Sequence, residues 1–306
     1  MAEGSEPTGA DFGHAPVMQQ EVIEMLKATR DMDCIDMTTG MGGHAEALLE
    51  ATAPAGRLLA IDRDADALAV ARKRLDRFGS RVSFAHRSFA EARACAEEAG
   101  FPRAHAILFD LGASSPQLDS GSRGFSFRED APLDMRMDSR TRLTAEDIVN
   151  TWRQEDLERI LSGNGNEPLA RGIARAICRR RATRPLHTTG ELAGLVSGVY
   201  LGRGWHHSKL HPATRTFQAL RMAVNDELGA LAAGLEAALA LLSAGGRMAV
   251  LSFHSGEDRM VKQFFKAHSA SGRPVTKKPM VPADTECARN PRARSAKLRV
   301  FEKDAA

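Results

Sequence analysis

One stretch, Cys34-Ile35-Asp36-Met37-Thr38-Thr39-Gly40-Met41-Gly42-Gly43-His44, organises the rest of the chain. It passes from a short apolar run into glycines and then into a helical pattern. Glycine lets the backbone take positive φ and approach a ligand that a Cβ would push away, and the start of a helix points unpaired N–H groups at that ligand. The stretch therefore predicts a strand, a loop and a helix that together bind a cofactor.

A second apolar strand, Arg57-Leu58-Leu59-Ala60-Ile61-Asp62, ends in an acid. Its carboxylate falls about 20 residues after the glycines, the distance at which the second strand of a Rossmann-like unit presents an acid to a ribose diol. The glycines also fit the dinucleotide fingerprint G-x-G-x-x-A. The pattern predicts a nucleoside cofactor and leaves its identity open, with an ordinary tight turn as the alternative.

The composition is that of a globular chain with a buried core: 306 residues, 43 % hydrophobic and 26 % charged, with a formal net charge of +3. The four cysteines lie far apart and show neither a C-x-x-C pair nor zinc spacing, so we expect a cytoplasmic setting without disulfides and without a metal. No apolar run has the length of a membrane span. Residues 1–13 lack the apolar core of a signal peptide and are expected to be a disordered lead-in.

Further strands are expected at 82–86, 104–110 and 248–253, with an amphipathic helix at 64–78. Strands that alternate with helices and open their loops at one edge predict a doubly wound, mainly parallel sheet of the α/β class. Residues 297–301 are expected to add a last, antiparallel strand. The predicted fold is therefore Rossmann-like.

The alternation of strands and helices breaks after Asp110. A long loop without a sustained period leads to a capping-box start at Thr144, and helical patterns then continue. We therefore predict one discontinuous α/β domain, made of residues 14–137 and 212–306, and a small helical domain inserted at 138–211.

Two more helices are expected after the insertion. One is long and regular from Phe217 to Leu242, and Gly245-Gly246 end it. The other covers 259–268, and the spacing of Ser255 and Asp258 is typical of its cap.

The predicted insertion is rich in basic residues with little acid between them. Cations beside an aromatic ring suit a phosphate backbone and an unstacked base, so the segment predicts RNA binding, with a solvated helix face as the alternative. Its histidines lie in one short loop without carboxylates or cysteines, which argues against a metal. The residues are Arg171, Arg175, Arg179, Arg180, Arg181, Arg184, Arg203, Trp205, His206, His207, Lys209 and His211.

Two enzyme classes compete for the nucleoside site. The sequence disfavours a nicotinamide dehydrogenase, because the residue four positions after Tyr200 is Gly204, where a Tyr-x-x-x-Lys pair needs lysine. A methyltransferase would place the ribose of S-adenosylmethionine on Asp62. No cysteine follows a proline, so a Pro-Cys nucleophile for carbon-5 methylation is missing and methylation at nitrogen or oxygen remains. Asp110 and the turn Ser114-Ser115-Pro116 suit an exocyclic amine, which hydrogen-bond acceptors must hold in line with the methyl group.

A series of motifs carries a specific resemblance. They are, in order, His14-x-Pro-Val, Asp36-x-Thr-x-Gly-x-Gly-Gly-His44, Asp110-Leu-Gly-Ala-Ser-Ser-Pro-Gln117, Arg123-Gly-Phe-Ser-Phe127, Pro132-Leu-Asp-Met-Arg-Met137, His211-Pro-Ala-Thr-Arg-Thr-Phe-Gln218, Ser252-Phe-His-Ser255 and Asn290-Pro-Arg-Ala-Arg-Ser295. Together they resemble the RsmH (MraW) family of small-subunit rRNA cytosine-N4 methyltransferases. Two places are atypical: Asn166-Glu167, where the family pattern has paired acids, and Gly256, where leucine is usual.

The resemblance implies methyl transfer from S-adenosylmethionine to N4 of a cytidine in the decoding region of 16S rRNA, with the rRNA or the small subunit as partner. On the substrate side we expect Asp110, Ser115, Pro116 and, at the end of a later strand, His254, because their loops leave the same carboxyl edge of the sheet. An rRNA-binding assembly factor without essential catalysis is the alternative from another class. The sequence does not distinguish a monomer from a homodimer. With Gly40 of the glycine loop, the expected cofactor residues are Gly42, Gly43, His44, Asp62, Phe89, Asp110 and Gln117.

Overall fold

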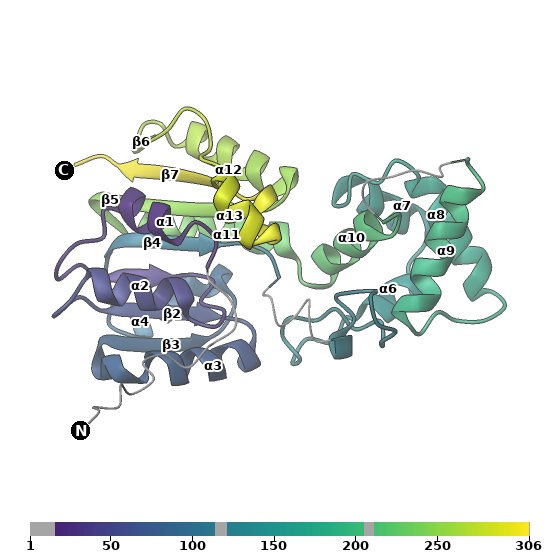
Figure 1. Cartoon of the computed structure of the whole chain (residues 1–306), viewed down its shortest axis with the longest axis horizontal. Helices are drawn as coiled ribbons and strands as arrows, with labels where there is room; N and C mark the ends of the chain where they lie inside the picture. Colours follow the sequence, from purple (N-terminus) through teal and green to yellow (C-terminus); the bar gives the residue numbers. More distant parts are fainter. Residues whose placement is uncertain (1–15, 114–120, 205–210, 306) are drawn as a thin grey trace, which may run out of the picture. The chain divides into compact units, whose positions relative to one another are not determined.

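A computed structural model describes residues 16–113, 121–204 and 211–305 of the chain (Figure 1). Within these residues one sheet has the strand order β3-β2-β1-β4-β5-β7-β6. Strands β1 to β5 are parallel, and β7 runs antiparallel to both β5 and β6. The strands are β1 (Cys34–Asp36), β2 (Leu58–Asp62), β3 (Val82–His86), β4 (Ala104–Asp110), β5 (Leu242–Ser252), β6 (Gly272–Pro274) and β7 (Lys297–Lys303). The predicted Rossmann-like sheet and its antiparallel last strand are confirmed.

The central strands are apolar because helices cover both faces of a parallel sheet. β1 is buried along its whole length, and so is β2 up to its last residue. The helix predicted at 64–78 is α3 (Ala65–Leu75), whose N-cap Asp64 accepts hydrogen bonds from the N–H groups of Asp66 and Ala67 at 3.0 and 3.4 Å. The other helices that accompany the sheet are α1 (Gln19–Leu26), α2 (Gly43–Ala51), α4 (Ala92–Glu98), α12 (Ser255–Ala267) and α13 (Asp284–Arg289).

The chain divides into two compact units. The sheet unit comprises residues 16–87, 91–111 and 236–305, and the helical unit comprises 88–90 and the described part of 112–235. The helical unit contains α6 (Ala145–Thr151), α7 (Gln154–Gly163), α8 (Ala170–Arg181), α9 (Thr189–Leu201) and α10 (Thr214–Val224), and the division falls within α11 (Glu227–Leu241).

The helical unit is larger than the insertion expected at 138–211. Side chains from both flanks, such as Leu133 and Met135 before it and Phe217 and Leu220 after it, are buried in the same core as α6 to α9. A boundary read from helical periodicity misses these residues, because apolar residues in a loop have no period. The capping box expected at Thr144 is present, with Asp147 as its partner.

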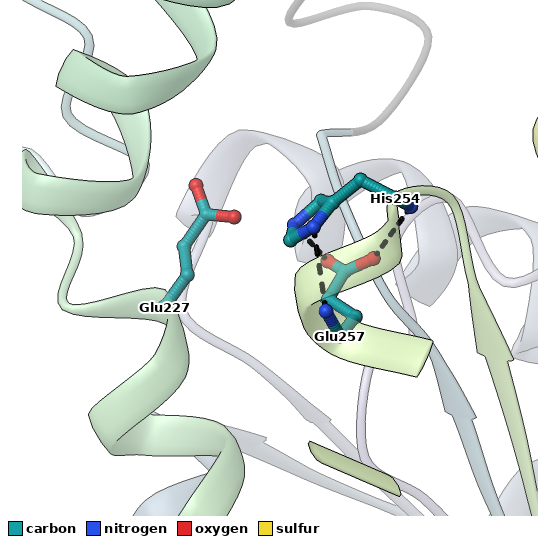
Figure 2. A group of neighbouring side chains, drawn as sticks. All are labelled: Glu227, His254 and Glu257. Atoms are coloured by element: carbon teal, nitrogen blue, oxygen red, sulfur yellow. Dashed lines mark hydrogen bonds and ion pairs between the residues drawn. The ribbon is translucent and has the colours of Figure 1, made fainter. Parts of the chain in front are cut away.

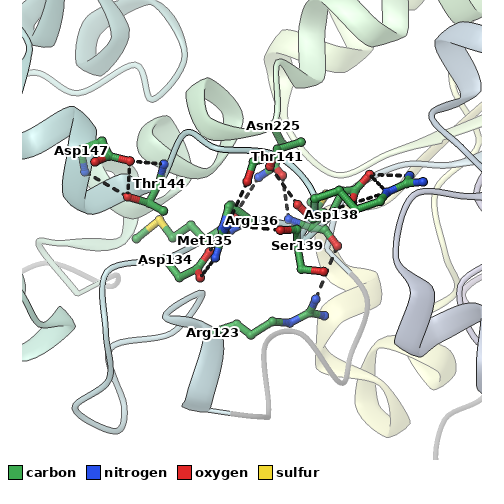
Figure 3. A network of polar contacts seen from close by, with 12 residues as sticks. Arg123, Asp134, Met135, Arg136, Asp138, Ser139, Thr141, Thr144, Asp147 and Asn225 are labelled. Atoms are coloured by element: carbon green, nitrogen blue, oxygen red, sulfur yellow. Dashed lines mark hydrogen bonds and ion pairs between the residues drawn. The ribbon is translucent and has the colours of Figure 1, made fainter.

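The prediction of one long helix from Phe217 to Leu242 is wrong, because the helix is interrupted at Asn225 and Asp226. Asp226 has a φ of 45°, which ends α10 before α11 begins. The Asn225 amide donates to the carbonyl of Met135 (Figure 3) and to that of Arg221, and it accepts from the N–H of Met137, each at 2.8 Å. Gly245 and Gly246 lie inside β5, which begins at Leu242.

The segment whose backbone Asn225 binds contains a further network of polar contacts (Figure 3). Arg136 donates from Nε and Nη2 to the two carboxylate oxygens of Asp134, both at 2.7 Å, and from Nη1 to the carbonyl of Thr141 at 2.8 Å. Partial burial raises the pKa of Asp134, but its hydrogen bonds with Arg136 outweigh burial and hold the pKa below its usual value. The motif at 132–137 is thus a structural element of the helical unit. In the described part of the chain, no helix is both long and apolar enough to cross a membrane.

Candidate functional site at the carboxyl edge of the sheet

Three parallel strands end in an acid at the same edge of the sheet. Asp36, Asp62 and Asp110 are the last residues of β1, β2 and β4. The strand order reverses between β1 and β4, and ligands of such sheets bind outside the carboxyl ends of the strands at this switch point. The predicted residues Asp62 and Asp110 are therefore on the ligand edge, and Asp36 lies there as well.

The glycines of the first loop have different roles. Gly40 has a φ of +53°, and a Cβ on it would meet only the Thr38 carbonyl oxygen, at 4.0 Å, so the space beside it is open. A Cβ on Gly43 would overlap Cγ of Pro16. Gly42 is the N-cap of α2 with a φ of +84°. Gly43 is thus required by packing of the chain, whereas Gly40 leaves room for a ligand.

Asp62 fixes the glycine loop. Its Oδ2 accepts from the N–H of Gly40 at 2.7 Å, and its Oδ1 accepts from the N–H of Asp64 at 2.9 Å. Burial raises the pKa of this carboxyl, and the two backbone hydrogen bonds oppose that rise. The carboxylate therefore joins the end of β2 to the loop after β1, and each of its oxygens keeps a further lone pair for a ligand.

The centre of the edge is formed by Asp36, His44 and Asp110. Asp36 is fully buried, and its Oδ1 accepts from the N–H of Thr38 at 3.1 Å. Nε2 of His44 lies 3.5 Å from Oδ2 of Asp110, and Oγ1 of Thr38 accepts from the N–H of Asp110 at 2.6 Å. Burial raises the pKa of Asp36 to about 7, with neighbouring His44 acting in the opposite direction.

Several buried polar atoms of this centre have no hydrogen-bond partner among the residues that the structure describes. They are Oδ2 of Asp36, both ring nitrogens of His44 and Oδ1 of Asp110. Buried polar atoms in native proteins are almost always satisfied, so an unsatisfied set gathered at a switch point indicates a polar ligand.

Asp36 and Thr38 are site residues that the sequence patterns did not single out. The available signal is local: Asp36 is a charged residue in an apolar strand, immediately before the loop. Only the pairing of β1 with β4 shows that Thr38 contacts Asp110.

Other expected residues are placed less completely. Phe89 begins a short 3-10 turn, Phe89–Glu91, soon after β3, and its side chain is partly buried. Ser115, Pro116 and Gln117 lie outside the described residues, as do Trp205, His206, His207 and Lys209. His211 lies against Phe127, with ring centroids 4.5 Å apart.

His254 is the N-cap of α12, so the cap expected from Ser255 and Asp258 is wrong. Nδ1 of His254 accepts from the N–H of Gly256 at 3.2 Å and from the N–H of Glu257 at 3.3 Å, and Figure 2 shows how His254 and Glu257 lie. In return, the Glu257 carboxylate accepts from the N–H groups of Phe253 and His254. Asp258 instead accepts from Nε of Arg299, at 2.7 Å, and from Lys297.

This cap fixes the tautomer of His254. Because Nδ1 is an acceptor, the proton of the neutral ring is on Nε2, which is buried 3.2 Å from Oε1 of Glu257. The start of α12 therefore orients the ring, with Nδ1 engaged in the cap and Nε2 facing the Glu257 carboxylate.

The chain is similar to known proteins over nearly its whole length. Residues 11–304 match the MraW methylase family. The chain is 46 % identical to ribosomal RNA small subunit methyltransferase H of Geobacter sp. (strain M21), over 96 % of this chain and 99 % of that protein. It is 48 % identical to the protein of that name from Syntrophotalea carbinolica, over 95 % of this chain and 98 % of that protein. An rRNA methylase structure from Streptococcus thermophilus, 11 % identical over 94 % and 93 % of the two chains, has a TM-score of 0.44, a likeness too distant to bear on function.

Proposed function

The chain belongs to the MraW methylase family, and from this premise we propose that it transfers a methyl group from S-adenosylmethionine to N4 of one cytidine in the decoding region of 16S rRNA. The observation that carries the proposal is the set of unsatisfied buried atoms on Asp36, His44 and Asp110 at the switch point of the sheet. A nicotinamide dehydrogenase is not supported, because Tyr200 donates to the buried Glu167 at 2.5 Å and is engaged in the helical core.

The residues present fit S-adenosylmethionine. Its ammonium group needs acceptors, and the carboxylate oxygens of Asp110 and Asp36 without partners in the described chain are acceptors. Its ribose diol needs an acid, and Asp62 ends the second strand. Open space beside Gly40 admits a group close to the backbone. When bound, the cofactor supplies a methyl group on a positively charged sulfur.

We assign the remaining cofactor contacts as the family resemblance implies. Gly42, Gly43 and His44 form the start of α2, where helix N–H groups favour the cofactor carboxylate. Phe89 takes a face of the adenine ring, and Gln117 contacts the cofactor from the loop after β4.

On the substrate side, the chain must hold an exocyclic amine whose lone pair is delocalised into the base. Acceptors directed at the N4 hydrogens localise the lone pair and align it with the methyl group. We assign this role to Asp110 and to the backbone before Pro116, with Ser115 at the turn. His254 has one nitrogen occupied by the cap of α12, so we assign it a positioning role through Nε2.

The substrate is the small ribosomal subunit or its rRNA, and the proposed setting is the cytoplasm. All four cysteines are free thiols, and Cys34 and Cys95 are buried, which suits a reducing compartment.

The decisive experiment is mass spectrometry of nucleosides. Small subunits from cells that lack the protein are incubated with the purified chain and S-adenosylmethionine, and we expect N4-methylcytidine to appear. Formation of 5-methylcytidine, or no methylcytidine on either free rRNA or assembled subunits, contradicts the proposal. Full rescue of the deletion strain by Asp110→Ala would instead favour an assembly factor without essential catalysis.

A further inference from the structure

We propose that α8 and α9 form a groove that binds the phosphate backbone of the RNA substrate through Arg175, Arg179 and Arg203. This inference rests on the proposed function and names a docking surface for its substrate. The groove belongs entirely to the helical unit, in which α8 and α9 pack side by side (Figure 1).

The groove has a volume of about 390 Å³, and its lining in the described part of the chain contains no acidic side chain. Arg175 and Arg179 are one helical turn apart on α8, about 6 Å along its axis. Arg203 follows the end of α9. The lining residues are Gly172, Arg175, Arg179, Leu195, Gly198, Val199, Gly202 and Arg203.

Several arginines of α8, and Arg203 after α9, differ in their surroundings. Arg181 donates to the carbonyls of Val149 and Trp152 at 2.7 and 2.6 Å, and Arg180 pairs with Glu191 at 3.6 Å. These two hold the helical unit together. Within the described chain, the guanidinium groups of Arg175, Arg179 and Arg203 have neither a hydrogen-bond acceptor nor an acid. Three cations that converge on one groove without acids complement an anionic chain.

Glycines form part of the lining of the groove. Gly198 is an exposed residue in the interior of α9, and a Cβ there would meet no atom within 4 Å. Glycine is among the least favourable residues for a helix interior, and the packing of this unit does not require it at 198. A residue without a side chain at this point lets the backbone of a partner lie close to the helix.

The chemistry of the groove favours RNA phosphates over other occupants. Guanidinium groups bind phosphate oxygens with two parallel hydrogen bonds. Among the residues that the structure describes, the lining has no aromatic ring for base stacking and no amide or carboxylate side chain to read a base edge. The groove therefore positions the RNA and does not select its sequence.

The first test is removal of charge. Arg175→Gln/Arg179→Gln is compared with Arg142→Gln, which changes an exposed arginine outside the groove and without a partner in the described chain. Affinity for in vitro transcribed 16S rRNA is measured over a series of salt concentrations. We expect roughly tenfold weaker binding or more, and a salt slope reduced by about one for each phosphate that no longer binds an arginine. S-adenosylmethionine affinity and kcat stay unchanged while KM for small subunits rises.

The second test fills the groove without changing charge. Gly198→Gln places a good helix former in its lining, and the matched control Gly194→Gln changes another exposed, unobstructed glycine of α9 that does not line the groove. Both variants are expected to be at least as stable as the parent, but only Gly198→Gln should weaken RNA binding.

The outcomes separate this inference from the proposed function. If the parent methylates small subunits while the arginine pair variant binds RNA with the parent's affinity and salt slope, the groove proposal is overturned and the function stands. Equal weakening by Arg142→Gln or Gly194→Gln also overturns it, because the effect would not belong to the groove. If the parent transfers no methyl group but the groove variants alone lose RNA affinity, the groove stands and the function fails.

Discussion

Nε2 of His44, on the first turn of α2, lies 3.5 Å from Oδ2 of Asp110, the last residue of β4. The glycine loop after β1 and the end of β4 are thus joined at the switch point, where Thr38 accepts from the backbone of Asp110. Because both side chains also carry buried polar atoms without partners in the described chain, the pair forms the centre from which cofactor binding can be tested.

Asp110→Asn should weaken S-adenosylmethionine binding at nearly constant shape. A hydrogen bond to a charged group contributes about 1.5–3 kcal/mol, so we expect a loss of about 10- to 150-fold in affinity by calorimetry. The control Asp76→Asn changes an exposed acid outside the site and should leave affinity unchanged. If Asp110→Asn binds S-adenosylmethionine with the affinity of the parent, the Asp110 carboxylate does not contact the cofactor.

Asp36 should make stability fall as the pH rises. Its pKa is about 7 in the folded chain and close to 3.8 when unfolded, so the folded state binds the extra proton. Folding is therefore penalised progressively between about pH 4 and pH 7, by at most about 4 kcal/mol. Asp36→Asn keeps an acceptor for Thr38 and should flatten this part of the profile in chemical unfolding at several pH values. An unchanged slope would assign the pH dependence to other groups.

Gly43→Ala should destabilise the sheet unit through Pro16. The new methyl group overlaps the proline ring, and overpacking of this kind costs about 1–3 kcal/mol. Pro16→Ala in the same chain should restore part of the loss, which a double-mutant cycle by chemical unfolding measures. Strict additivity of the two changes would mean that the methyl group clashes with something other than Pro16.

Tyr200→Phe should destabilise the helical unit and leave the cofactor site intact. Tyr200 donates to the buried Glu167 at 2.5 Å, and burial together with this hydrogen bond raises the pKa of the phenol. Without the hydroxyl, the Glu167 carboxylate keeps, among the described residues, its contact with the N–H of Leu169, so we expect a loss of about 1–3 kcal/mol. Thermal unfolding and S-adenosylmethionine calorimetry are measured together, and a change in cofactor affinity would contradict a purely structural role.

Two substitutions of His254 separate its cap from its positioning role. Asparagine is a good N-cap, so His254→Asn should keep the stability of α12, whereas His254→Ala should lose about 1 kcal/mol. If Nε2 contacts the substrate, both variants lower kcat at nearly constant cofactor affinity. A kcat for His254→Asn equal to that of the parent would leave the histidine with the cap alone.

The sequence by itself determined the features that depend on near neighbours. The strand that ends at Asp62, the glycine loop after β1 and the capping box at Thr144 follow from patterns within a few residues, because the conformational preferences and hydrogen bonds that produce them are local. The order of the motifs also identified the family and, with it, the cofactor.

Only the tertiary structure decided what depends on residues far apart in the chain. Asn225 breaks a regular helical pattern because its partners are the backbones of Met135 and Met137, and a helical period contains no information about them. Arg181 is structural and Arg179 faces a groove although both belong to one basic run, because residues two apart on a helix point in nearly opposite directions. Asp110 meets His44 and Thr38 only because β1 pairs with β4, and strand pairing is a long-range choice that no local pattern records.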